Sequence, residues 1–415
     1  MKTTVVLVTL FAAVNSQWFA SPPFYASQYT GVGGARGIIT DPAGDLLILG
    51  RSINGIAVVY ETQNGDGTID VVNQRIVIGN GLNLNHGVAY NDGYIYAGSA
   101  SSIYRWPYTP GNRTQISVGE ELVVTGLPTG GHDSHAIVFD SQGRFYCSIG
   151  SQNNVDQNSS RAKLLRFTLT GNLPKQYAEG ELFAEGLRNE GGLAFDNNGV
   201  LHGVENGADN LNRADLGGDI HDLNPTEEFN RFDGPLGQHF GYPYCFSTYN
   251  LPGYAPGTQF AWPDFMNDGV HNDDWCKNVN NNRPPLIAMS AHEAPLGFDF
   301  YRGQNCGNGG GAFPCNMTGD AFVSFHGSWN RTPASGYRVA RFPFNAAGNA
   351  TGEELNVISE LDVAGCANGP CIRPVDAAFN DNGHLFITAD ANGFIVRVTY
   401  GTPGPTIRRN IVRLN

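Results

Sequence analysis

The chain has 415 residues, of which 54 are glycine, 23 are proline and only 15% are charged. This composition favours many short strands joined by tight turns over helices that rely on charge pairs. Acidic residues outnumber basic ones by 38 to 25, and the net charge of −13 argues against nucleic acid and anionic membranes as partners.

The first sixteen residues have the pattern of a secretory signal peptide. Lys2 precedes an apolar run over residues 5–14, and Val14 and Ser16 offer small residues for cleavage before Gln17. The run is too short to span a bilayer. We expect residues 1–16 to be a signal peptide and residues 17–415 to form one secreted domain. Sequons for N-glycosylation agree with secretion, and they begin at Asn112, Asn158, Asn316, Asn330 and Asn349.

The seven cysteines indicate three disulfides and one free thiol in an oxidising compartment. Two close pairs flank glycine-rich loops, and a third pair brackets a long irregular segment. The expected disulfides are Cys245–Cys276, Cys306–Cys315 and Cys366–Cys371. Cys147 remains in an apolar strand, where we expect a buried, unreactive thiol.

A hairpin pattern recurs along the chain. In each copy a short apolar strand is followed by a turn rich in Asn, Asp and Gly and then by a second apolar strand. A degenerate copy has its second strand delayed until Ala321. The copies begin at Arg36, His86, His135, Gly191, Ala294 and Arg373. Six hairpins at about fifty-residue spacing predict an all-β, six-bladed β-propeller, and a two-sheet sandwich explains them less well.

A long segment, residues 209–290, separates the fourth and fifth copies. It is rich in Asn, Asp, Gly and Pro and contains Cys245 and Cys276. We expect an ordered insertion between blades 4 and 5 that caps one face of the disc, and not a second domain.

Polar side chains are expected to gather at one end of the central channel. In each blade the first strand starts on the face of the disc where the second strand ends. Residues just before a first strand and residues just after a second strand therefore surround the same end of the channel. They are Arg36, His86, His132, Asp133, His135, Arg188, Asn189, Glu190, His292, Glu293 and Arg373 before the first strands, and Arg51, Gln152, Asn153, Glu205, Asn206, His326, Trp329, Arg331 and Asp390 after the second strands. This set predicts a cation-rich binding site.

The charges of this set indicate what it binds. Arginines at one channel mouth repel each other unless an anion or carboxylates lie between them. Because guanidinium groups match carboxylates, we expect a planar molecule with several carboxylates, for which Trp329 offers a stacking face. A histidine there suits proton abstraction near neutral pH. The oxygen-rich loop at residues 205–209 would suit calcium.

Several segments resemble the soluble sugar dehydrogenases that use pyrroloquinoline quinone, in particular the fungal pyranose dehydrogenase and sorbosone dehydrogenase-like branches. Residues 131–134, with the strand at 146–150, resemble the segment of the catalytic histidine, and the match falls on His132 and not on His135. The segment at 186–193 resembles the cofactor-binding Arg-Asn turn, on Arg188 and Asn189. Residues 205–208 resemble the calcium loop, with Ala208 in place of the usual proline. Residues 213–219, 240–245 and 326–331 resemble the sorbosone-type branch.

The resemblance implies a site for pyrroloquinoline quinone and calcium at the channel mouth. His132 would take the hydroxyl proton of a sugar that is oxidised at C1, and electrons would leave to an external acceptor such as a cytochrome or a copper enzyme. Calcium would be held by Asn206, Gly207 and Ala208. The paired arginines of bacterial relatives are reduced here to Arg373. Residues implied to bind the cofactor are Arg51, His86, Arg188, Asn189, His326, Trp329 and Arg373.

Two other functions are compatible with a propeller. A calcium-dependent hydrolase of the lactonase kind would need a central cation held by carboxylates from several blades. A glycan-binding propeller without catalysis would require neither His132 nor the Arg188-Asn189 turn.

Overall fold

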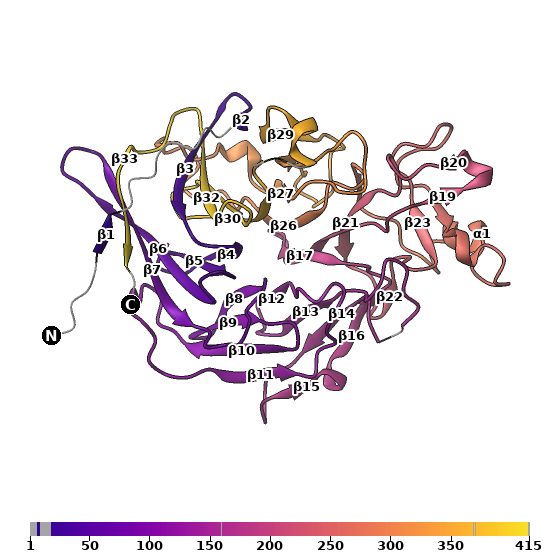
Figure 1. Cartoon of the computed structure of the whole chain (residues 1–415), viewed down its shortest axis with the longest axis horizontal. Coiled ribbons are helices and arrows are strands. Elements are labelled where there is room, and N and C mark those ends of the chain that lie inside the picture. The colour runs from indigo at the N-terminus through magenta and orange to yellow at the C-terminus, as the bar shows by residue number, and fades with distance from the viewer. Residues whose placement is uncertain (1–5, 9–17, 159, 368, 370, 414–415) are drawn as a thin grey trace.

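The computed structural model describes residues 6–8, 18–158, 160–367, 369 and 371–413, and in this part of the chain six β-sheets stand around a central channel (Figure 1). One strand of each sheet lines the channel and contacts the corresponding strands of the two neighbouring sheets. These first strands are β4 (Ala35–Thr40), β8 (Val88–Asn91), β12 (Ile137–Phe139), β17 (Glu190–Phe195), β26 (Pro295–Phe300) and β30 (Pro374–Phe379). The prediction of a six-bladed propeller is confirmed.

Each first strand pairs antiparallel with the strand that follows it in sequence, so all six predicted hairpins are present in the described residues. The degenerate copy also forms its hairpin across the long connection. The second strands are β5 (Leu46–Gly50), β9 (Tyr94–Gly98), β13 (Phe145–Ile149), β18 (Leu201–Glu205), β27 (Ala321–Phe325) and β31 (Leu385–Ala389).

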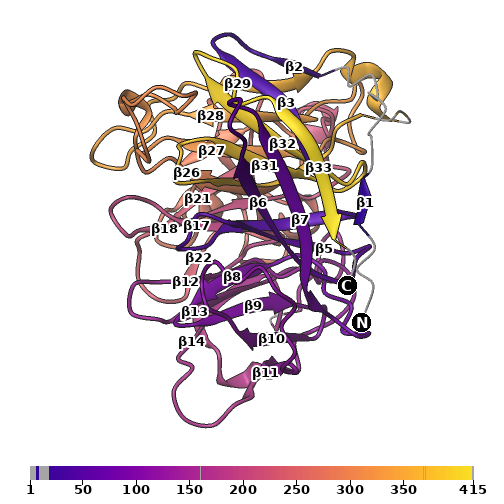
Figure 2. The same cartoon turned by 90° about the vertical axis from the view of Figure 1, so that its left-hand side faces the viewer.

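Third and fourth strands complete the blades, and the ring is closed by strands from both ends of the chain (Figure 2). The third strands are β6 (Gly55–Gln63), β10 (Ser102–Pro107), β14 (Lys163–Phe167), β21 (Glu227–Phe232), β28 (Arg338–Phe342) and β32 (Phe394–Tyr400). The fourth strands are β7 (Ile69–Ile78), β11 (Glu121–Thr125), β16 (Glu181–Glu185), β25 (Ile287–Met289), β29 (Leu355–Glu360) and β3 (Phe24–Gly31). Because β3 pairs with β32, the N-terminal part of the chain supplies the outer strand of the last blade.

Additional outer strands extend blades 1, 2, 3 and 5. β33 runs parallel to β7 on blade 1, and β1 pairs with β33. They are β33 (Ile407–Arg413), β1 (Val6–Val8), β15 (Lys175–Gln176), β22 (Gln238–His239) and β2 (Trp18–Ala20). Of the expected signal peptide at 1–16 only Val6–Val8 is described, and the rest lies outside the described residues.

The blades pack face to face through apolar side chains, and glycines let the first strands approach closely. Leu47 and Val58 of blade 1 share one apolar cluster with Val88 and Ile95 of blade 2. Burial of each such side chain contributes roughly 1.5–3 kcal/mol. A Cβ atom on Gly37 would lie 2.4 Å from the backbone oxygen of His86, which precedes β8, so only glycine fits directly after Arg36. The repeat therefore fixes how close polar residues at the strand starts come together.

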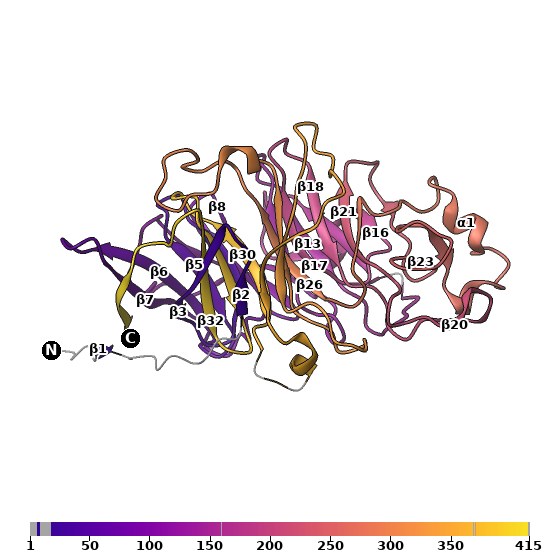
Figure 3. The same cartoon turned by 90° about the horizontal axis from the view of Figure 1, so that it is seen from above.

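The insertion lies within blade 4, and not between blades 4 and 5 as expected. β21 and β25 belong to residues 209–290, yet they are the third and fourth strands of blade 4. The remaining loops extend outward from this blade, on one side of the disc, and not across its face (Figure 3). They contain β19 (Asn212–Arg213), β20 (Gly218–Asp219), β23 (Cys245–Ser247), β24 (Gln259–Ala261) and the helix α1 (Asp273–Lys277).

The cysteine predictions are confirmed. Disulfides join the three expected pairs, and Cys147 is free and buried in β13. Cys245–Cys276 ties β23 to α1 and so holds the insertion together. Among the described residues, no helix combines the length and apolar character needed to cross a membrane.

Candidate functional site

The predicted polar residues lie at the end of the channel where the first strands begin, which we call the mouth. Contacts there join consecutive blades. The Arg51 Nε–H donates to the Asn85 backbone oxygen at 2.9 Å, and the Asn85 amide donates to the Asp133 backbone oxygen at 2.9 Å. Arg51 is exposed, so its guanidinium remains accessible to a ligand at the rim.

Asp390 joins blades 1, 5 and 6 at the mouth. Its carboxylate accepts hydrogen bonds from Arg36 at 2.8 Å and from His326 Nε2 at 2.9 Å. The other ring nitrogen of His326 lies 3.3 Å from Arg373 Nη1, and Arg373 also reaches the Tyr337 hydroxyl at 3.4 Å. The structure thus brings together His326, Arg373, Arg36 and Asp390, all of which were expected at the mouth.

His132 presents one ring nitrogen as a base. Its Nδ1 lies 3.0 Å from Ser151 Oγ and 3.2 Å from the Ser151 backbone oxygen. The Ser151 hydroxyl donates its hydrogen bond to the Asn153 backbone oxygen. Toward His132, both the hydroxyl oxygen and the backbone oxygen of Ser151 are therefore acceptors, and Nδ1 must carry the hydrogen. Nε2 therefore holds a lone pair. Burial and the neighbouring Arg188 lower the pKa of His132 to about 4, which keeps this base unprotonated at neutral pH.

The loop that carries His132 is held from below by Arg161. This buried guanidinium donates to the backbone oxygens of Thr129, Gly130 and Gly150 at 2.6–3.0 Å. A Cβ atom on Gly150 would lie 2.5 Å from the His132 Cβ, so glycine lets the histidine rest directly on β13. The position of the base is therefore set by packing as well as by hydrogen bonds.

The other two histidines of blades 2 and 3 differ from His132. Both ring nitrogens of the fully buried His135 contact backbone oxygens, those of Ser148 at 2.7 Å and Ala100 at 3.1 Å, which leaves no ring nitrogen for a substrate. His86 Nε2 donates to the Gly191 backbone oxygen of blade 4 at 2.8 Å. Since blade 3 lies between these two blades, His86 reaches across the channel below the mouth.

Buried polar atoms without a hydrogen-bond partner lie at the mouth and just below it. Arg36 Nε and His86 Nδ1 are both in this state, although their residues are only 6% and 4% exposed. Burial and the nearby Arg36 and Arg51 lower the pKa of His86 to about 3. The ring is therefore neutral, and Nδ1 can accept a hydrogen bond while Arg36 Nε can donate one. These free groups, among several arginines, fit an anionic ligand with polar ring atoms.

Arg188 is the centre of the contacts on the opposite side of the mouth. Its guanidinium forms an ion pair with Asp209 at 2.9 Å and donates to the Asn154 side-chain oxygen at 3.0 Å. It also donates to the Gly207 backbone oxygen at 2.8 Å. Asn189, next in sequence, donates from its amide to Asn206 at 2.8 Å. The Arg188-Asn189 turn thus holds the loop predicted to bind calcium.

Some of the oxygen atoms in this loop that could bind calcium already accept hydrogen bonds. Asn206 Oδ1 accepts from Asn189 and Asn206 Nδ2 donates to the Pro295 backbone oxygen at 2.7 Å, so the side chain is fixed and keeps one lone pair on Oδ1. The backbone oxygen of Gly207 faces Arg188, and that of Ala208 follows it in the loop. Calcium fits these two carbonyl oxygens only if Arg188 releases the first of them.

Three glutamates lie in one row across blade 4 beside Arg188. Glu190 is opposite Glu205, and Glu205 is opposite Glu228. Burial raises the pKa of Glu190 and Glu205 well above their usual range and that of Glu228 to about 7. The row therefore holds protons at neutral pH and does not carry three negative charges. Asp209 is the carboxylate that balances the charge of Arg188.

Trp329 lies on the loop that follows β27 and is 77% exposed. Neighbouring residues anchor this loop, since Arg331 donates to the Ser290 hydroxyl at 2.8 Å and Ser328 is hydrogen-bonded to Ser335. The indole therefore projects from a fixed loop and is open to solvent.

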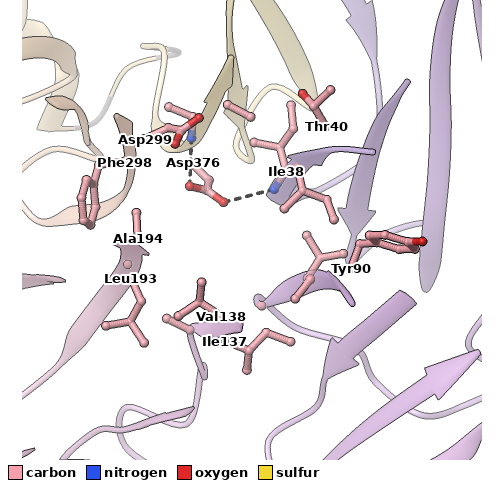
Figure 4. Close-up of a pocket in the computed structure, with 18 of the residues that line it drawn as sticks. Ile38, Thr40, Tyr90, Ile137, Val138, Leu193, Ala194, Phe298, Asp299 and Asp376 are labelled. Carbon is pink, nitrogen blue, oxygen red and sulfur yellow. Dashed lines mark hydrogen bonds between the residues drawn. The ribbon is translucent and has the colours of Figure 1, made fainter. Parts of the chain in front are cut away.

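A cavity of about 490 Å³ occupies the opposite end of the channel, where the hairpin turns lie (Figure 4). Its walls combine apolar side chains of the first strands, such as Ile38 and Leu193, with charged groups that include Asp299, Arg302 and Asp376, and His86 and Gly191 lie at its inner end. Asp376 accepts the Ile38 backbone N–H at 3.1 Å within it. No sequence feature predicts an open space there.

Sequence reasoning identified most of the mouth residues but missed the groups that orient them. Asn154, Ser151 and Arg161 were not singled out, although Ser151 opens the polar segment after a second strand. Position alone could have suggested Ser151. Only the folded chain could identify Arg161, because its partners are backbone oxygens of a separate loop.

Comparisons with known proteins agree with this architecture. A family model described as TrAA12-like matches residues 24–401. A pyrroloquinoline quinone-dependent pyranose dehydrogenase from Coprinopsis cinerea is 28% identical over 401 residues, which cover 87% of this chain and 52% of that protein. A pyrroloquinoline quinone-dependent sugar dehydrogenase from Hypocrea jecorina is 28% identical over 393 residues, which cover 88% and 85%.

Among solved structures, the holo form of the pyranose dehydrogenase PQQ domain from Coprinopsis cinerea matches with a TM-score of 0.78 and 25% identity. The match covers 93% of this chain and 97% of that one. The chain spans about half the length of the pyranose dehydrogenase that it matches in sequence.

Proposed function

The chain belongs to the TrAA12-like family, and from this premise we propose that it oxidises a sugar with pyrroloquinoline quinone as cofactor. The observation that carries the proposal is the pairing of a base with a cationic mouth. His132 has a free Nε2 lone pair on the same end of the channel as Arg36, Arg188 and Arg373.

The cationic side chains would hold the carboxylates of the cofactor. Arg373, Arg51 and Arg188 are the guanidinium groups for this task, and the unpartnered Arg36 Nε adds one further donor. His86 Nδ1 would accept a hydrogen bond from the same molecule, and Trp329 would cover it from the solvent side. When bound, the quinone supplies the acceptor for the hydride that leaves the sugar.

His132 acts on the substrate hydroxyl. Its Nε2 would take the proton while Ser151 keeps Nδ1–H in place and so stabilises the imidazolium that forms. For oxidation of a sugar at C1, the hydroxyl on that carbon must lie within hydrogen-bond distance of Nε2. We infer that the arginines orient the cofactor and that the exposed Trp329 contacts the sugar ring.

We further propose that calcium binds together with the cofactor, at the backbone oxygens of Gly207 and Ala208. Arg188 now donates to the first of these oxygens, and a carboxylate of the cofactor would offer its guanidinium another acceptor. Calcium should therefore bind more tightly to the protein with quinone than to the protein alone. Equal calcium affinity in calorimetric titrations with and without quinone would contradict this coupling.

The compartment and the electron acceptor complete the proposal. The basic and apolar start of the chain and its sequons support secretion, and the electrons would pass to a separate redox protein, such as a cytochrome or a copper enzyme.

Reconstitution tests the function directly. Purified protein is titrated with pyrroloquinoline quinone while its tryptophan fluorescence is recorded, and reduction of a dye is then followed with a panel of aldoses, in calcium and in chelator. We expect saturable quinone binding and sugar-dependent dye reduction that chelator suppresses. Turnover of lactones or esters without quinone binding would favour the hydrolase instead.

A further inference from the structure

Asp390 connects three blades at the channel mouth. It follows β31 of blade 6, and its side chain is 18% exposed. One carboxylate oxygen accepts from Arg36 of blade 1 at 2.8 Å, and the other accepts from His326 of blade 5 at 2.9 Å. No ligand is needed for this arrangement, because the protein itself satisfies both oxygens.

The carboxylate decides where the proton of His326 lies. An ionised carboxylate can only accept hydrogen bonds, so His326 Nε2 must donate. Burial alone would raise the pKa of Asp390, but His326 and Arg36 outweigh it and hold the pKa well below its usual range. His326 Nδ1 is then left as a lone pair, and it accepts from Arg373 Nη1 at 3.3 Å.

We propose that Asp390 is a positioning residue for the cofactor site, because through His326 it holds Arg373, and directly it holds Arg36, in the orientation that binds the carboxylates of the cofactor. The proposal rests on the proposed function in that it takes the quinone as the ligand. Asp390 itself would not touch the reacting atoms.

An asparagine at this position cannot replace the carboxylate. It has one acceptor and one donor group, whereas Arg36 and His326 both present donors. If the asparagine oxygen accepts from Arg36, its amide N–H faces His326 Nε2 and forces the hydrogen onto Nδ1. Nδ1–H then faces the Arg373 N–H, and the contact that orients Arg373 is lost.

Charge and orientation predict opposite effects for this substitution. Arg36 and Arg373 carry two positive charges and Asp390 one negative charge, so Asp390→Asn makes the mouth more positive. Electrostatic attraction alone would then strengthen the binding of an anionic quinone. Loss of orientation weakens binding, because charge-assisted hydrogen bonds to a carboxylate depend on the direction of the donors.

The experiment compares Asp390→Asn with Asp381→Asn in the full chain. Asp381 is an exposed aspartate of the same blade that lines the cavity at the other end of the channel, so its substitution changes the charge equally. Affinity for pyrroloquinoline quinone is measured by tryptophan fluorescence, and the protonated ring nitrogen of His326 by NMR of ¹⁵N-histidine protein. Melting curves exclude unfolded variants.

We expect Asp390→Asn to weaken quinone binding roughly tenfold or more, as loss of one charge-assisted hydrogen bond implies, and to move the His326 hydrogen to Nδ1. Asp381→Asn should change neither reading. Asp390→Glu keeps two acceptor oxygens and should restore the Nε2–H form with part of the affinity. Unchanged or tighter quinone binding in Asp390→Asn would overturn the proposal, whatever the melting temperature.

The NMR reading separates this proposal from the proposed function. If the wild-type protein binds no quinone, the function fails, and the positioning of a cofactor fails with it. The control of His326 by Asp390 is then still decided by the ring nitrogen that carries hydrogen in the variants. If His326 keeps hydrogen on Nε2 in Asp390→Asn, the proposal is wrong even when quinone binds the wild type.

Discussion

The two ends of the central channel differ in a way that separates a binding site from an open space. At the turn end a cavity of about 490 Å³ is lined by apolar side chains and by aspartates, and the oxygens of one of these, Asp376, accept backbone N–H groups. At the mouth the side chains are densely hydrogen-bonded, yet Arg36 Nε there and His86 Nδ1 just below it have no partner. Open volume alone would select the turn end. The basic side chains and the lone pair on His132 Nε2 select the mouth, and most of the predictions below contrast the two ends.

The largest effect is expected for the base. His132→Gln removes the Nε2 lone pair and should lower the turnover rate by roughly 10²- to 10⁴-fold, the usual contribution of a general base. Dye reduction at saturating sugar measures this rate, and quinone binding should persist. The matched variant His384→Gln changes a buried histidine at the turn end, whose Nε2 contacts the Gly310 backbone oxygen, and should leave turnover intact. Equal losses in both variants would show that the effect is structural.

The next effect concerns the arginine at the calcium loop. Arg188→Ala removes a guanidinium that meets Asp209 and Gly207, and quinone affinity should fall roughly ten- to hundredfold. The protein should also lose about 3–5 kcal/mol of unfolding free energy, because Asp209 is left buried without its partner. Urea unfolding and fluorescence titration measure the two quantities.

The control for this variant is Arg302→Ala at the turn end. Arg302 pairs with Asp299 at 2.7 Å, but its side chain is 43% exposed. An exposed ion pair contributes only about 0–1 kcal/mol, so both stability and quinone affinity should stay near the wild-type values. A comparable loss of affinity in Arg302→Ala would remove the distinction between the two ends.

The sequence predicts the ring of six blades well because each hairpin forms between residues that are close together in the chain. Each hairpin can be recognised from two apolar strands joined by an Asx-Gly turn. All first strands run in the same direction along the channel, so Arg36, His132 and Arg188, which precede first strands, lie at the same end. The outer strands of blade 4 were hidden in the insertion, since β21 contains two glutamates and β25 only three residues. Neither has a turn signal to mark it as part of a blade.

Partners between blades lie beyond sequence reasoning. Asp390 and Arg36 are 354 positions apart in the chain, and nothing in either segment indicates that they meet. The orientation of His132 depends on the Ser151 hydroxyl, whose own donor is used by the Asn153 backbone oxygen. Hydrogen-bond partners of this kind follow from three-dimensional packing, and they decide which ring nitrogen of His132 is the base.

A smaller effect is expected in the pH dependence of the reaction. Burial and Arg188 lower the pKa of His132 to about 4, so the base stays unprotonated down to that pH. At pH 5 roughly nine-tenths of the sites should be active, whereas an ordinary histidine with a pKa of about 6.5 would leave only a few per cent. The acid limb of kcat/KM against pH measures this directly. A limb near 6.5 would mean that His132 is not the base or that its surroundings are more polar.

The smallest effects are expected from glycans. The two ends of the channel should differ in glycosylation because their sequon asparagines differ in exposure to the modifying enzyme. The sequon residues Asn316 and Asn349 are exposed on the connections between strands at the turn end, whereas Asn330 is only 8% exposed and is next to Trp329 at the mouth. A buried amide cannot be reached by a modifying enzyme once the chain has folded. Mass spectrometry of secreted protein should therefore find glycans at the first two positions and an unmodified Asn330. Because the turn end takes no part in the proposed reaction, Asn316→Gln and Asn349→Gln should change kcat/KM by less than about twofold. A glycan on Asn330 would place a bulky polar group at the rim where the sugar enters, and it would contradict the proposed route of the substrate to His132.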